Sequence, residues 1–110
     1  MILDLETGKS MMRCDVSKYV HKNATHILIG VDAILEEPNP KHTIIFHAEV
    51  RFKETRLYLG DFYPGLKERR FILKISPRKK FLYTIPDLKY KVLAFYLLGY
   101  FVDKGTFFMV

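Results

Sequence analysis

The residues with the clearest capacity for chemistry are Asp32, His47 and Glu49, which lie on the polar sides of two segments with alternating apolar positions. If residues 26–36 and 42–53 pair as a hairpin with their apolar sides aligned, Asp32 falls beside His47, with Glu49 diagonal to it. Two carboxylates and an imidazole within side-chain reach could hold a divalent metal ion. These three residues are therefore weak candidates for a metal site.

The same segment resembles a known catalytic pattern. Asp32 followed by Glu49-Val50-Arg51 is similar to the D…ExK pattern of a broad nuclease superfamily. The resemblance implies that the two carboxylates bind Mg²⁺ and that a basic residue assists the attacking water. Arg51 stands where that pattern has lysine, and a guanidinium does not exchange a proton as an amine does. The superfamily also needs helices packed on its sheet, which this sequence scarcely predicts. We therefore expect a solvated polar strand face, no cofactor and no enzymatic activity.

The second set of candidate residues is basic. The first half of the chain, residues 1–55, has 7 Lys or Arg against 8 Asp or Glu, whereas residues 56–110 have 11 against 4. The net charge of +6 therefore comes from the second half, and it is densest in residues 67–91. Positive side chains beside aromatic rings are typical of surfaces that follow a phosphate backbone and stack on bases. The residues expected to contact nucleic acid are Arg69, Arg70, Lys74, Arg78, Lys79 and Lys80, with Phe81 or Tyr83 for stacking. The alternative is that the cations cover the wet faces of strands while the rings pack in the core.

The elements that must position these residues are predicted to be strands. Residues 44, 46, 48, 50 and 52 are apolar and most residues between them are polar, which is the period of a half-buried strand. Similar alternation occurs in residues 27–35, 55–63, 69–76 and 79–85, and turn signals recur about every 8 to 12 residues. A chain of 110 residues that is 49% apolar can form one domain with a core. We expect a single β-rich domain over residues 1–110, an antiparallel sandwich or barrel of about seven to nine strands.

Two segments leave alternatives. Residues 93–102 are apolar except for Gly99, so residues 88–102 fit a central strand or a buried helix, and an α+β fold is the alternative. The aromatic residues and the turn at residues 103–105 favour the strand, with a further strand at residues 106–110. Residues 15–20 could start a short helical turn capped by Asp15.

Cellular location is constrained by cysteine content. Cys14 is the only cysteine, so no internal disulfide can form, and a reducing cytoplasm or virion is expected. The longest nearly apolar segment, residues 92–102 with Gly99 inside it, has 11 residues, which is below the length that crosses a membrane, and acidic residues near the start argue against a secretory signal. The scarcity of asparagine and glutamine is a compositional hint of a thermophile.

Two classes of function remain. The first is a basic binding module for nucleic acid or another polyanion, which contacts it through residues 67–91. The second is a structural, assembly or host-interaction protein, of a kind that viruses also use, that oligomerises through its aromatic C-terminal strand. A continuous basic stripe with an exposed ring favours the first class, and scattered basic residues favour the second.

Overall fold

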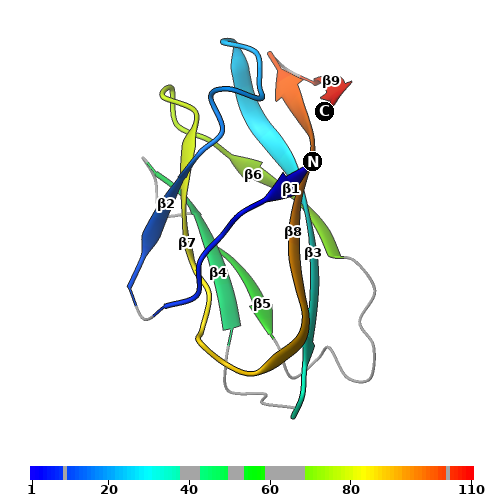
Figure 1. The fold of residues 1–110 in the computed structure, drawn as a ribbon. Coiled ribbons are helices and arrows are strands. Elements are labelled where there is room, and N and C mark those ends of the chain that lie inside the picture. Colours follow the sequence, from blue (N-terminus) through cyan, green and yellow to red (C-terminus); the bar gives the residue numbers. More distant parts are fainter. Residues whose placement is uncertain (9, 38–42, 50–53, 59–68, 104) are drawn as a thin grey trace.

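Two antiparallel sheets face each other and enclose the apolar core (Figure 1). The structure, a computed structural model, describes residues 1–8, 10–37, 43–49, 54–58, 69–103 and 105–110. Within these ranges every regular element is a strand, which confirms the predicted all-β sandwich. The strands are β1 (Ile2–Leu3), β2 (Met12–Asp15), β3 (Ala24–Leu35), β4 (Thr43–Ala48), β5 (Glu54–Tyr58), β6 (Arg69–Lys74), β7 (Lys80–Thr84), β8 (Tyr90–Val102) and β9 (Thr106–Met109).

The five-stranded sheet has the order β1-β8-β3-β6, and β9 also pairs with β8. The four-stranded sheet has the order β2-β7-β4-β5. The two longest strands, β3 and β8, pair along most of their length and form the centre of the five-stranded sheet. Buried and more exposed residues alternate over residues 31–35 of β3 and 94–97 of β8, because successive side chains of a strand point to opposite faces.

The core is formed by the inner faces of both sheets. Phe46 of β4 is fully buried, and its ring centroid lies 5.1 Å from Phe71, 6.0 Å from Phe95 and 6.1 Å from Phe81. Phe71 and Phe95 belong to the five-stranded sheet, so these tilted and edge-on ring contacts join the two sheets. Such contacts add to the stabilisation that burial of the rings provides.

Strand β8 resolves the ambiguity over the apolar C-terminal segment in favour of the strand. Leu28 of β3 lies opposite Gly99, and Ile29 lies opposite Leu97, so Leu98 is an extra residue in β8. This β-bulge shifts the alternation of β8 by one residue. The turn that follows contains Asp103 at φ 54° and Gly105 at φ 130°, and it leads into β9 as expected.

The predicted hairpin of residues 26–36 with residues 42–53 is wrong. β3 pairs with β6 and β8 in one sheet, whereas β4 pairs with β5 and β7 in the other. The apolar sides of both segments do point into one core, but they do so from opposite sheets. Residues 50–53 of the expected strand lie outside the described residues.

Residues 15–20 form a turn without a helix. The Ser17 N–H donates a 2.8 Å hydrogen bond to the Asp15 side chain, and the Tyr19 N–H donates to the Val16 carbonyl. The expected capping role of Asp15 is thus present, but in a turn. The hydrogen bond from the Ser17 side chain, then the one from its backbone N–H, and then the charges of Lys80 and Lys18 hold the pKa of Asp15 below its usual value.

Candidate functional site

Strands β9 and β1 lie end to end along the same side of β8. Met109 lies opposite Gly99, and Ile2 lies opposite Tyr96. Between them, the Val110 N–H donates to the Leu98 carbonyl at 3.1 Å, and the Leu97 N–H donates to the Met1 carbonyl at 2.9 Å, both distances typical of a strand ladder. Residues 106–110 followed by residues 1–3 therefore form one nearly continuous strand, which we call the composite edge. Figure 1 places both chain ends at this position.

The hydrogen bonds of the composite edge determine which backbone groups face away from β8. Since the Val110 N–H points toward β8, alternation places the N–H and C=O of Phe108 on the same side. The N–H and C=O of Phe107 and Met109 therefore point outward. These two residues offer the backbone donors and acceptors that another strand would need.

The side chains of β9 pack against both faces of β8. On the outer face, which is the side of the five-stranded sheet away from the core, the Phe107 ring contacts Phe101 at a centroid distance of 4.9 Å. It also lies over Gly99, where a Cβ atom would collide with it. On the other face, Phe108 stacks on Tyr100 at 5.4 Å with an interplanar angle of 22°. These contacts hold β9 in place through its aromatic residues.

The composite edge differs from the other outermost strands in charge. β2, β5 and β6 each contain at least one charged residue, for example Arg13, Arg56 and Arg70. Neither β1 nor β9 contains Lys, Arg, Asp or Glu. Proteins commonly place charges on edge strands to prevent pairing with other chains, and the composite edge lacks this protection.

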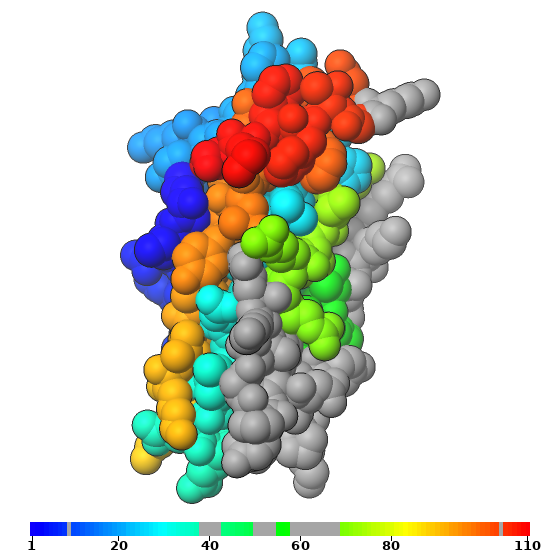
Figure 2. Space-filling view, turned by 90° about the vertical axis from the view of Figure 1, so that its right-hand side faces the viewer, coloured from blue at the N-terminus to red at the C-terminus, as the bar shows by residue number. Residues whose placement is uncertain are grey.

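The composite edge is also apolar and exposed. Met109 is 83% exposed and Ile2 is 72% exposed, and Phe107, Phe108 and Val110 are each 40 to 45% exposed. Figure 2 shows the outer face, with β9 at one end and β1, β8, β3 and β6 following one another across it. Exposed apolar residues that gather in one place are a common sign of an interaction surface.

A cavity of about 320 Å³ opens on this outer face beside the composite edge. Its lining includes Leu28, Arg70, Phe107 and Met109. Arg70 lies opposite Gly30, and two positions along β6 Ile72 is exposed. Lys74 follows at the next outward position, opposite His26. Arg70 and Lys74 are thus the two predicted nucleic-acid residues that share this face.

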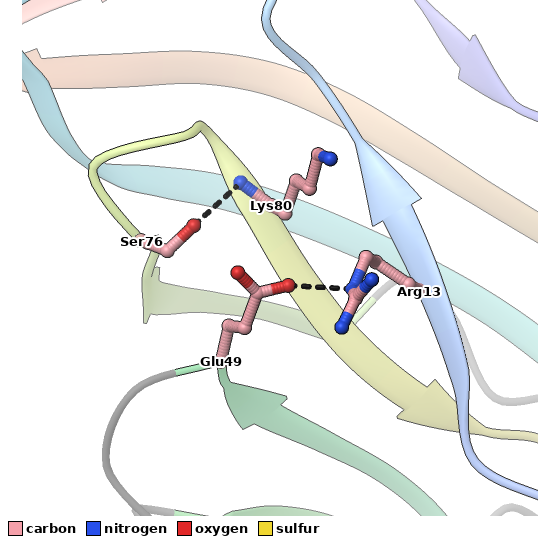
Figure 3. Close-up of polar contacts among 4 residues, drawn as sticks. All are labelled: Arg13, Glu49, Ser76 and Lys80. Atoms are coloured by element: carbon pink, nitrogen blue, oxygen red, sulfur yellow. Dashed lines mark hydrogen bonds and ion pairs between the residues drawn. The ribbon is translucent and has the colours of Figure 1, made fainter.

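Lys80 lies on the opposite side of the molecule, on the outer face of the four-stranded sheet. It pairs with Asp15 of β2, and its charge contributes to the lowered pKa of that carboxyl. Nearby, Arg13 reaches across β7 to Glu49, with 2.6 Å between Nε and Oε2 (Figure 3). Opposite charges are therefore mixed on this face, and the residues described there do not form a continuous basic stripe.

The remaining basic candidates lie between or beside these two faces. Lys79 is in the corner between β6 and β7, at φ 64°, and its Nζ donates a 2.8 Å hydrogen bond to the Ala24 carbonyl. Its ammonium is thus used to connect this corner to β3. Arg78 is exposed in the same corner, and Arg69 is exposed at the start of β6.

The expected stacking role of Phe81 and Tyr83 is wrong. Phe81 is fully buried, and Tyr83 is 3% exposed, because both point into the core from β7. The Tyr83 hydroxyl accepts a hydrogen bond from the Glu6 backbone N–H, which satisfies its polar end. Neither ring is available to a base.

The structure does not bring the three metal candidates together. Asp32 is half-buried on the outer face of the five-stranded sheet, opposite Ala94. His47 is buried in β4 of the other sheet, and Glu49 forms its ion pair with Arg13. Among the described residues, no group of three His, Cys, Asp or Glu is placed to hold a metal ion. Arg51 lies outside the described residues.

The sequence pattern predicts the C-terminal part of the composite edge and not its N-terminal part. The aromatic segment 106–110 was expected to be a strand, but nothing in the pattern of Met1-Ile2-Leu3 indicates that it continues the same edge. The two segments are at opposite ends of the sequence, and only their common pairing with β8 joins them.

Within the ranges that the structure describes, there is no apolar helix of the length needed to cross a membrane. No family model matches the chain, and comparisons with curated proteins and with solved structures found no similar protein.

Proposed function

We propose that this protein is an assembly protein whose copies associate by strand addition at the composite edge. The observation that carries the proposal is that this edge is exposed, apolar and without charged side chains, while each other outermost strand contains charged residues. An additional strand would satisfy the outward backbone groups of Phe107 and Met109 and cover the most exposed apolar side chains.

The distribution of basic residues favours an assembly protein over a nucleic-acid-binding module. The candidates for phosphate contact are divided between the two outer faces and the corner that connects them. The rings proposed to stack on bases are buried. A surface that follows a phosphate backbone needs its cations on one side.

The experiment is sedimentation velocity over a range of concentrations, with the wild-type chain and Met109→Pro. The Met109 N–H points outward, so proline at this position removes an edge donor without breaking a hydrogen bond to β8. We expect the wild type to associate and Met109→Pro to dissociate about tenfold more readily or remain monomeric. A wild type that is monomeric at every concentration contradicts the proposal.

A second variant guards against misfolding of the proline variant. Met109→Lys adds a charge at the composite edge, and Ile72→Lys adds the same charge at an exposed apolar residue of β6. We expect Met109→Lys to weaken association and Ile72→Lys to leave it close to the wild-type value. Equal effects of the two variants would mean that association depends on exposed apolar residues in general and not on the composite edge, which contradicts the proposal.

Binding of a nucleic acid or another polyanion is a second candidate, favoured by one observation. Arg70 and Lys74 flank the exposed Ile72 on the outer face, and both Arg70 and Phe107 line the cavity there. We expect Arg70→Glu with Lys74→Glu to reduce oligonucleotide binding at low salt, whereas Lys80→Glu on the opposite face leaves it unchanged. Binding that is absent at about 50 mM salt, or equally sensitive to Lys80→Glu, contradicts this candidate.

A further inference from the structure

Self-association at the composite edge has one favoured geometry. We infer that two copies pair their β9 strands antiparallel about a two-fold axis that passes between the two Phe108 residues, which closes the assembly as a dimer. This inference rests on the proposed function and specifies its partner, a second copy of this chain, together with the register of pairing.

The register follows from the direction of the backbone groups. In a regular antiparallel ladder, residues whose N–H and C=O face the partner must lie opposite residues that do the same. Phe107 and Met109 face outward, while the Val110 N–H is bonded to Leu98. A two-fold axis at Phe108 places Phe107 of each copy opposite Met109 of the other, so the outward backbone groups of β9 all find a partner.

Other two-fold registers leave outward groups unpaired. An axis at Phe107 places Met109 opposite Gly105, which is in the turn at φ 130°. An axis at Met109 places Phe107 opposite the junction between Val110 and Met1, where both residues bond to β8. Of these three axes, only the axis at Phe108 pairs both outward residues of β9, Phe107 and Met109, in each copy.

The side chains and charges favour a second copy as the occupant. Phe108 is 45% exposed and already stacks on Tyr100. The axis brings the two Phe108 rings together as a cross-strand pair, between the two Tyr100 rings, which continues the aromatic contact across the interface. The net charge of +6 opposes contact between two copies in general, so contact is least opposed at an edge without charged side chains.

The contact is also self-limiting. An interface in which the same surface of each copy pairs with itself closes as a dimer, whereas a head-to-tail contact can continue as a filament. The two five-stranded sheets would join into one sheet through their β9 strands. We therefore expect one discrete dimer, without higher assemblies that grow with concentration.

Disulfide trapping tests the register, with Cys14→Ala as the background because Cys14 is the only native cysteine. In Phe108→Cys the two introduced residues lie opposite each other at a Cα separation of about 4.5 Å, within the range of a disulfide. Thr106→Cys is the matched control, because in this register the two Thr106 residues are about 13 Å apart. We expect mild oxidation to give a covalent dimer with Phe108→Cys and none with Thr106→Cys.

A second measurement keeps Phe108 in place. The register puts Thr106 of one copy opposite Val110 of the other, so a mixture of Thr106→Cys and Val110→Cys chains should form the mixed disulfide in preference to either symmetric one. The register is wrong if Thr106→Cys alone is trapped, or if the mixture forms no mixed disulfide while the wild type associates. Those results leave the proposed function intact, because association that Met109→Pro weakens would still be observed; a monomeric wild type would overturn both.

Discussion

The Phe107 ring occupies the space that a side chain at position 99 would need. Gly99 is buried in β8, and a Cβ atom built there would overlap the edge of the Phe107 ring. The glycine therefore lets β9 lie close to β8 with its aromatic ring over the neighbouring backbone. The position of the composite edge depends on this contact between two residues of adjacent strands.

Gly99→Ala should displace Phe107 and loosen β9. We expect a loss of about 1–3 kcal/mol in the free energy of unfolding, typical of overpacking, together with weaker self-association. Gly8→Ala is the control, because a Cβ atom at Gly8 meets nothing within 4 Å. Urea denaturation of both variants measures the difference, and equal stability of the two would refute the role assigned to Gly99.

Phe46→Ala should destabilise the sandwich more than any change on its outer faces. The Phe46 ring is fully buried against rings from both sheets, so its removal leaves a cavity that costs about 3–5 kcal/mol. Ile72→Ala, at a residue that is 55% exposed, should cost well under 1 kcal/mol. Thermal and chemical unfolding should rank the two variants in that order, and similar losses would contradict the described core.

Cys14 should react slowly with thiol reagents. Burial, and then the charge of Asp15, raise the pKa of Cys14 to about 11. At pH 8 the thiolate is therefore roughly 100-fold scarcer than for a thiol with an unshifted pKa. The rate of alkylation should rise with pH through about 11, and Asp15→Asn should accelerate it. A rate like that of a free thiol at pH 8 would show that Cys14 is accessible.

The same pKa shift has a consequence for stability. A thiol whose pKa is higher in the folded than in the unfolded state stabilises the fold below the unfolded value near 9. This contribution is lost as pH rises from 9 through about 11, because the unfolded chain releases its proton first. Cys14→Ala should therefore lose stability less steeply than the wild type over this interval in urea denaturation. Parallel pH profiles of the two proteins would contradict the shift.

The sequence predicts the strands better than it predicts their partners. Alternation at residues 44, 46 and 48 identifies an apolar face that is buried in the structure. It does not distinguish a neighbour in the same sheet from a strand in the facing sheet, because both arrangements bring apolar sides together. For this reason the sequence pattern predicts a pairing of β3 with β4 that the structure does not have. The expected contact between Asp32 and His47 depends on that pairing and is therefore absent from the structure.

The candidate site shows the same limit. Aromatic residues 81 and 83 could belong to a core or to a stacking surface, and only their inward direction in β7 decides for the core. The strand at residues 106–110 was predictable from composition. Its union with residues 1–3 was not, because it depends on β8 pairing with both ends of the chain.

Amide hydrogen exchange at the composite edge tests the central claim most directly. In the monomer the Phe107 and Met109 amides face solvent, while the Val110 amide is bonded to Leu98 and serves as an internal reference. If copies associate by strand addition, exchange at Phe107 and Met109 should slow as protein concentration rises, and the Val110 amide should be protected throughout. Exchange at Phe107 and Met109 that stays fast at concentrations where the chain is associated would contradict the account.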